Sequence, residues 1–216
     1  MEKTSELAGR RPLKSRASTW AGGLSRVLVK SGVSANMISL LSVVFALGAC
    51  AVLVGVGEGR WPRLALLAVA VCVQLRLVCN LMDGMVAIEG GKKSATGDLF
   101  NEVPDRIADV VILAGAGFCV FAQPWGIHLG WLAAALAVMT ACIRMQGAAL
   151  TGKHDFSGPM AKQHRMAFIT ALCVIGALLP NVTDWFLWVL ALIVVGEIVT
   201  LARRLVGIAA ILKGKS

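Results

Sequence analysis

Long apolar runs recur along the chain, and they constrain the fold more than any other feature. Runs with few or no charged residues lie near 37–57, 64–82, 106–122, 125–146, 164–180 and 184–203. A helix needs about 20 residues to cross the hydrocarbon core of a bilayer. Because 57% of the residues are hydrophobic and only 15% are charged, the chain cannot bury this surface in a soluble core of its own size. The sequence therefore predicts an all-α, polytopic membrane protein with six transmembrane helices.

The distribution of basic residues predicts the orientation of these helices. Lys and Arg concentrate in the N-terminal tail, in segments 83–105 and 147–163 and at the C-terminus, whereas the alternate loops carry only Arg60 and Arg63. The positive-inside rule then places both termini in the cytoplasm. Tryptophans mark the predicted outer ends, where indole rings prefer the headgroup region: Trp61, Trp125, Trp131, Trp185 and Trp188. We expect a bacterial inner (plasma) membrane protein with both termini cytoplasmic.

The chain divides into two parts at the start of the first apolar run. Residues 1–36 are expected to form a cytoplasmic tail and an N-terminal interfacial helix, since residues 20–30 (WAGGLSRVLVK) mix apolar and basic side chains; a plain basic linker is the alternative. Residues 37–216 form the predicted six-helix membrane domain. Basic loops and anionic lipids explain the net charge of +9 without nucleic acid. The six cysteines lie in apolar runs and are interpreted as buried thiols.

Polar residues between 76 and 109 are the strongest indication of function, because ionisable groups at membrane depth are costly and rare. Helical spacing predicts two polar faces that can meet at the cytoplasmic boundary. They contain Arg76, Asn80, Asp83 and Ala87 on one helix, and Asp98, Asn101, Glu102, Asp105 and Asp109 on the next. A set of oxygen ligands favours Mg²⁺ or Mn²⁺ over zinc. A solvated loop between two spans is the alternative, but it does not explain why Asn80 and Asp109 lie inside apolar runs.

The spacing of these residues resembles a known family signature. The pattern Asn80-x2-Asp83-Gly84-x2-Ala87-Ile88-x8-Gly97-x3-Asn101-x3-Asp105 has the intervals of D-x2-D-G-x2-A-R-x8-G-x3-D-x3-D, the motif of the CDP-alcohol phosphatidyltransferases. Residues 158–166 (GPMAKQHRM) are similar to the glycine–lysine element before the fifth helix of that family, and Asn36 and Ser39 stand where its first helix starts. Three positions depart from the motif, since Asn80 and Asn101 replace aspartates and Ile88 replaces the arginine.

The resemblance implies an enzyme that transfers a substituted phosphate from a CDP-alcohol, CDP-diacylglycerol in the first instance, to an acceptor alcohol with release of CMP. It implies Mg²⁺ or Mn²⁺ as cofactor, a CDP-linked lipid donor, membrane lipids as surroundings and a homodimer. The metal ligands would be Asp83, Asp105, Asn80 and Asn101. Asp83 and Asp105 would be the catalytic pair, with Asp105 as general base. The candidate donor- and acceptor-binding residues are Asn80, Gly84, Ala87, Gly97, Asn36, Arg144, Lys162 and Arg165.

The departures from the motif change the expected charge of the site. With two carboxylates in place of four, one tightly held divalent ion gives about the same net charge as two ions give in the full motif. Basic residues near the fifth helix, Arg144, Lys162 and Arg165 among them, suit an anionic acceptor or the donor phosphate; anchoring at the cytoplasmic interface is the alternative for Lys162. Glu197, alone in the sixth run, is expected to pair with a buried base such as Arg76 or Arg144.

Two other functions fit part of the pattern. Asn101-x3-Asp105-x3-Asp109 also matches the N-x3-D-x3-D motif of intramembrane aromatic prenyltransferases, but those enzymes use more spans and a second aspartate-rich motif. Loss of two aspartates and the arginine would also produce a catalytically silent membrane protein that binds lipid or nucleotide. Metal-dependent release of CMP separates the phosphatidyltransferase from both alternatives.

Overall fold

The structure, a computed structural model, describes residues 18–89, 97–179 and 184–214. Within these ranges the chain is helical and contains no strand. The elements are α2 (Thr19–Lys30), α3 (Ala35–Gly57), the short 3-10 helix η2 (Arg63–Ala65), α4 (Leu66–Glu89), α5 (Gly97–Cys119), α6 (Gly126–Thr151), α7 (Lys162–Leu178) and α8 (Trp185–Lys213). The all-α prediction is confirmed for these residues.

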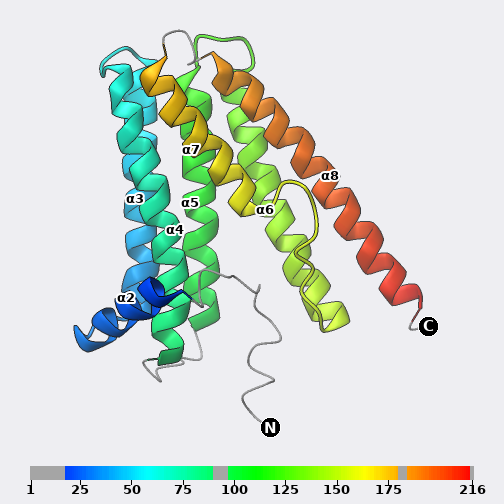
Figure 1. The fold of residues 1–216 in the computed structure, drawn as a ribbon. Helices are drawn as coiled ribbons and strands as arrows, with labels where there is room; N and C mark the ends of the chain where they lie inside the picture. Colours follow the sequence, from blue (N-terminus) through cyan, green and yellow to red (C-terminus); the bar gives the residue numbers. More distant parts are fainter. Residues whose placement is uncertain (1–17, 90–96, 180–183, 215–216) are drawn as a thin grey trace.

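The long helices pack side by side as a bundle, and α2 lies across its lower end (Figure 1). Helix α3 packs against α4 and α5, α5 against α6, α6 against α8, and α7 against α4. Small residues allow close approach, since a Cβ added to Gly130 in α6 would lie 2.7 Å from Gly117 Cα in α5. Helices in lipid pack through such residues because apolar burial alone does not drive them together.

Four segments are long and apolar enough to cross a membrane: Ala35–Gly57, Arg63–Glu89, Gly126–Thr151 and Trp185–Lys213. With the fold, they make this chain an integral membrane protein. The prediction of six spans is confirmed only in part. Helix α7 has 17 residues, and α5 carries charged side chains over its first half. Both nevertheless run alongside the four apolar segments within the bundle (Figure 1).

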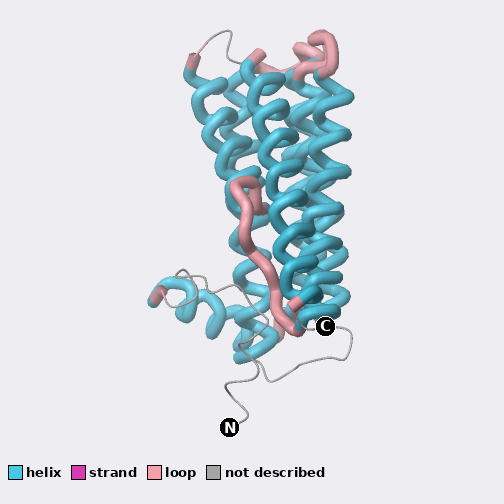
Figure 2. Tube along the Cα trace, turned by 90° about the vertical axis from the view of Figure 1, so that its right-hand side faces the viewer, coloured by secondary structure: helices cyan, strands magenta, loops and turns pink. Residues whose placement is uncertain are grey.

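Helix α7 begins part-way up the bundle. Residues 152–161 leave the lower end of α6 and climb along the bundle before α7 starts (Figure 2). The segment ends at Lys162, the first residue of α7. This arrangement brings the basic first turn of α7 inside the bundle.

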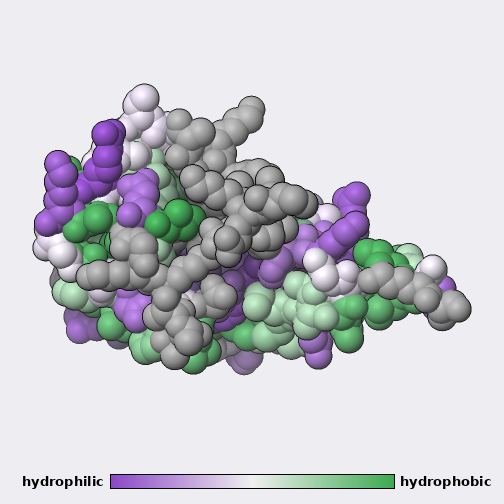
Figure 3. Space-filling view, turned by 90° about the horizontal axis from the view of Figure 1, so that it is seen from below, coloured by the Kyte–Doolittle hydropathy of each residue, from purple (hydrophilic) through white to green (hydrophobic). Residues whose placement is uncertain are grey.

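A small core at the lower end joins α2 to the helices that carry the sequence motif. Ala21 of α2 packs there with Ile38 of α3 and with Met82 and Met85 of α4. Trp20, Leu24 and Val27 on the same helix remain exposed, beside the exposed Arg26. Figure 3 views this end of the molecule and shows hydrophilic side chains beside apolar ones. The division at residue 36 stays a prediction, and residues 1–17 of the expected tail lie outside the described residues.

Candidate functional site

Buried and half-buried charges meet between α4 and α5. Arg76 in α4 is fully buried, and its Nη2 donates to Asp105 Oδ1 at 2.7 Å and to Asp109 Oδ1 at 2.6 Å. Asn80, one turn further along α4, donates from Nδ2 to the same Asp105 oxygen at 2.6 Å. The two halves of the motif are therefore in direct contact across antiparallel helices.

Helix α7 completes this cluster from the other side. Lys162 Nζ donates to Asp105 Oδ2 at 2.5 Å, and Arg165 Nη2 donates to Asp109 Oδ2 at 2.7 Å. Arg165 Nη1 also lies 3.1 Å from Glu197 Oε1 of α8. Each aspartate is thus held between a base from α4 and a base from α7. We call Arg76, Asp105, Asp109, Lys162, Arg165 and Glu197 the charge cluster.

Asp83, the other aspartate retained from the motif, lies next to this cluster and is held by neutral donors. Its Oδ2 accepts a hydrogen bond from Ser39 Oγ of α3 at 2.9 Å, and its Oδ1 accepts one from the Gly84 amide at 2.5 Å. Asp83 is 4% exposed and lies within electrostatic reach of Asp105 and Lys162. Within the described residues no base forms an ion pair with it, so its negative charge is available there to a cation or a polarised donor.

Arg144 belongs to a separate group between α5 and α6. Its Nη2 donates to both carboxylate oxygens of Glu102, at 2.9 and 3.0 Å, and Glu102 also pairs with Arg106 one turn along α5. The guanidinium carbon of Arg144 lies 5.6 Å from the ring centroid of Phe156. In this conformation Glu102 occupies the Nη2 donor of Arg144.

The remaining predicted site residues lie around the same end of α3, α4 and α5. Gly84 is buried; Ala87, Gly97, Asn36 and Asn101 are half-buried. Asn101 precedes Asp105 by one helical turn, which keeps it on the side of α5 that faces the cluster. The side chain of Asp98, also expected on this face, lies outside the described residues. The assignment of all these residues to donor or metal binding stays a prediction.

Glu197, the buried acid of α8, pairs with a buried base as predicted, but that base is neither of the two examples that the sequence suggested. Glu197 contacts Arg165 rather than Arg76 or Arg144, because α7 lies between α8 and α4 at this level. The sequence placed Arg76 on the polar face of the motif, because an arginine inside an apolar run is rare, but it did not predict that Arg76 bonds to Asp105 and Asp109. Thr200 and Arg204 of α8 were not identified as site residues, and both are buried.

The donor chemistry around Asp83 fits a hard divalent cation. No group of three or more His, Cys, Asp or Glu side chains in the described part of the chain is arranged to hold a metal. Mg²⁺ and Mn²⁺ prefer oxygen ligands such as the carboxylate of Asp83 and the side-chain carbonyl of Asn80. The amide nitrogen of Asn80 bonds to Asp105, which leaves its carbonyl oxygen for a cation. Asp83 and the charge cluster hold four carboxylates and three bases, so one cation suits the local charge better than two.

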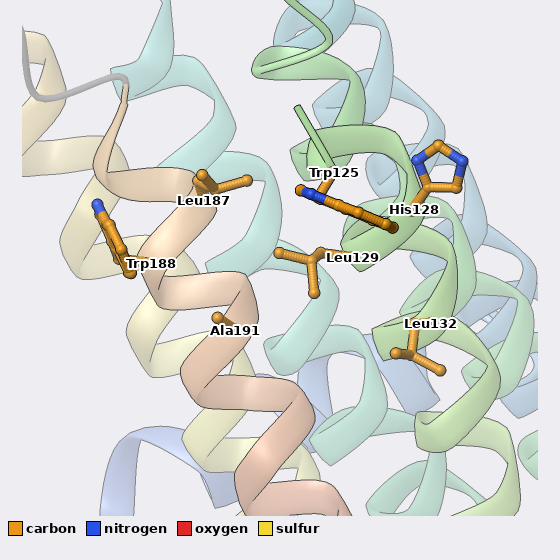
Figure 4. Close-up of a pocket in the computed structure, with 7 residues that line it drawn as sticks. All are labelled: Trp125, His128, Leu129, Leu132, Leu187, Trp188 and Ala191. Carbon is orange, nitrogen blue, oxygen red and sulfur yellow. The ribbon is translucent and has the colours of Figure 1, made fainter. Parts of the chain in front are cut away.

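A cavity lies at the opposite end of the bundle from α2. A space of about 410 Å³ opens between the first turns of α6 and α8 and is lined by Trp125, His128, Leu129, Leu132, Leu187, Trp188 and Ala191 (Figure 4). Apart from one imidazole and two indoles its walls are aliphatic, which suits a lipid chain and not a phosphate. This cavity is therefore not the site predicted from the motif.

No protein-family model matches this sequence, and no curated protein matches it significantly. Solved structures do match. Mycobacterium tuberculosis phosphatidylinositol phosphate synthase (PgsA1) with CDP-DAG bound has a TM-score of 0.72 and 17% identity, covering 88% of this chain and 94% of that chain. The same enzyme in complex with manganese and citrate has a TM-score of 0.71 and 18% identity over 87% of this chain and 88% of that one. The chain thus has the fold of this synthase over most of its length.

Proposed function

We propose that this protein is a CDP-alcohol phosphatidyltransferase that transfers the phosphatidyl group of CDP-diacylglycerol to an alcohol and releases CMP. The observation that carries the proposal is the 2.6 Å contact between Asn80 and Asp105, which joins the two halves of the motif. The likeness in fold supports it, since the synthase of the same fold binds CDP-DAG in one structure and manganese in another. Neither half of the motif alone brings together the amide of Asn80 and the carboxylate of Asp105.

The reaction requires a hydroxyl to lose its proton and a phosphate bond to break. The acceptor oxygen forms a bond to the lipid-linked phosphorus, and the bond from that phosphorus to the CMP oxygen breaks, with its electron pair leaving on CMP. Asp105 is the carboxylate proposed to take the hydroxyl proton. Lys162, at 2.5 Å from Asp105, is the base proposed to contact the diphosphate, because it is half-buried at the end of a climbing segment and can exchange one anion for another.

A divalent cation bound at this site would withdraw negative charge from the diphosphate and stabilise the departing CMP. Asp83 is the proposed carboxylate ligand, with Asn80, Asn101 and Asp105 contributing further oxygens. The neutral donors that hold Asp83, Ser39 and the Gly84 amide, orient it without cancelling its charge. Asp105, by contrast, is already balanced by Arg76 and Lys162.

The pairing of Asp105 with two bases also favours a second candidate function, that of a catalytically silent lipid- or nucleotide-binding protein. Both Asp105 oxygens accept from bases or an amide, an arrangement that would also suit a purely structural cluster. Such a protein would bind CDP-lipid without releasing CMP. The phosphatidyltransferase is preferred because Asp83 is buried and, in the part of the chain that the structure describes, forms no ion pair with a base, which is costly in a site that serves no cation.

We further propose that α3 to α8 are six membrane spans with the charge cluster at the cytoplasmic end. The exposed tryptophans that precede or begin α6 and α8, Trp125 and Trp185, support this orientation because they mark the opposite end. A bacterial inner-membrane location and a homodimer are proposed on the resemblance alone.

The test is CMP release from purified protein in vesicles that contain CDP-diacylglycerol. Candidate acceptors are glycerol phosphate, inositol phosphate, serine and a second lipid, each assayed with Mg²⁺, with Mn²⁺ and with a chelator. Wild type should release CMP with at least one acceptor and lose activity in the chelator, and Asp83→Ala should be inactive while remaining helical. Binding of CDP-lipid without CMP release under every condition would establish the silent protein.

A further inference from the structure

Three polar side chains form a buried face along α8. Glu197, Thr200 and Arg204 follow one another at intervals of three and four residues, so they lie on one side of the helix. Their exposed fractions are 0%, 0% and 4%. Polar groups inside a membrane helix are costly unless they are bonded, so their partners indicate what they do.

All three side chains contact residues 157–165, which comprise the end of the segment that leads into α7 and the first turn of α7. Arg204 Nε donates to the Ser157 carbonyl at 3.0 Å, and the Met160 amide donates to Thr200 Oγ1 at 3.0 Å. Glu197 pairs with Arg165 in the first turn of α7. The contacts follow residues 157–165 in the opposite direction to α8, as expected for two segments laid side by side.

Arg204 also ties this segment to α6. Its Nη1 donates to the Thr140 carbonyl at 2.7 Å while its Nε holds Ser157. The fork of a guanidinium, which presents several donors in one plane, can serve two carbonyls on different elements at once. Arg204 thus fixes the spacing between α8, α6 and the segment.

Glycines allow the close approach that these bonds need. Gly158 has φ +118°, a conformation that other residues rarely adopt, and a Cβ at that position would overlap the Thr200 side chain. A Cβ on Gly196 of α8 would lie 2.8 Å from Met160 Cε. Residues 157–160 therefore pack against α8 in one specific position, which we call the seat of the segment.

We propose that Glu197, Thr200 and Arg204 are positioning residues that set the place of residues 157–165 and thereby hold Lys162 against Asp105. Ten residues separate the end of α6 from the start of α7, and the bonds to α8 hold Ser157 and Met160, which precede the ion pairs of Lys162 and Arg165. The role of Lys162 in turnover rests on the proposed function; the seating of the segment does not.

Hydrogen exchange of the protein in nanodiscs tests the seating directly. Thr200→Val keeps the shape of the side chain and removes the acceptor of the Met160 amide, so exchange in peptides covering 157–165 should accelerate about tenfold at that amide. Thr200→Ser keeps the hydroxyl and should behave as wild type. Thr140→Val is the matched control, because its hydroxyl donates to Ala137 O within α6. Unchanged exchange in Thr200→Val, or equal acceleration in Thr140→Val, overturns the proposal.

Kinetics tests the link to Lys162. If the α8 face positions the segment and does not touch the donor, Thr200→Val should lower kcat for CMP release about tenfold and change KM for CDP-lipid less than about twofold, with Thr200→Ser restoring kcat. Faster exchange with an unchanged kcat would overturn the claim that the seat matters for turnover. A wild type that releases no CMP would refute the proposed function, and the exchange experiment would still decide the seating.

Discussion

Arg76→Met tests whether the charge cluster is the electrostatic centre of the bundle. The substitution keeps an unbranched chain and removes the guanidinium, leaving Asp105 with Lys162 and Asp109 with Arg165 as their remaining bases. Removing one partner of a buried ion pair costs about 3–5 kcal/mol, and the remaining bases favour the lower end. In a chain of this length 1 kcal/mol shifts Tm by about 2–4 °C, so about 3 kcal/mol lowers Tm by about 6–12 °C.

The assay is thermal unfolding in one detergent, followed by tryptophan fluorescence. Arg60→Met is the matched control, because Arg60 pairs with Glu58 in an exposed loop and such pairs contribute about 0–1 kcal/mol. Arg76→Met combined with Asp109→Asn also neutralises one of the two carboxylates that lose Arg76 as a partner. The double variant should therefore recover a large part of the lost Tm. A Tm for Arg76→Met that matches that of Arg60→Met would refute the reasoning.

Three further substitutions test the roles proposed for site residues. Asp105→Asn should lower kcat about 10²–10⁴-fold with a smaller effect on CDP-lipid affinity, and equal losses in kcat and affinity would make Asp105 a ligand and not the base. Arg144→Ala should raise KM about tenfold for an anionic acceptor and leave KM for CDP-lipid unchanged. Glu102→Gln weakens the ion pair that holds Arg144 and should lower KM for the acceptor. If neither variant changes a KM value, Arg144 has a structural role. The double variant Asn80→Asp, Asn101→Asp should bind a second divalent ion more strongly and require more Mg²⁺ or Mn²⁺ for the same rate. The assay is metal titration of CMP release, with bound metal counted in parallel. If wild type and the double variant each bind two ions with equal affinity, the charge argument is wrong.

The apolar runs predicted where the helices lie but not where they end. The run at 64–82 becomes α4 to Glu89, and the run at 106–122 becomes α5 from Gly97. The helices continue past the apolar runs because a polar side chain does not break a helix, and most of the motif residues, from Asp83 to Asp105, occupy these extensions. Hydropathy thus located the apolar part of each helix, including Asn80 and Asp109, and missed the extensions that carry the rest of the site.

The site was predictable where local spacing determines contact. Asn80 and Asp105 sit on consecutive antiparallel helices, and their intervals in the sequence were sufficient to expect them together. The contacts of α7 and α8 were not predictable, because they depend on how far residues 152–161 climb before α7 begins. The partner of Glu197 and the buried seats of Thr200 and Arg204 follow from that tertiary detail, for which the sequence carries no periodic signal.

Lipid mass spectrometry of membranes that contain the protein tests the proposed transfer most directly. Cells expressing wild type and cells expressing Asp83→Ala at the same level differ in one buried carboxylate held by Ser39 and Gly84. We predict a phosphodiester lipid that is present with wild type and absent with Asp83→Ala, and its headgroup would identify the acceptor. Identical lipid profiles in the two membranes, with both proteins folded and CDP-diacylglycerol present, would contradict the assignment of this chain as a phosphatidyltransferase.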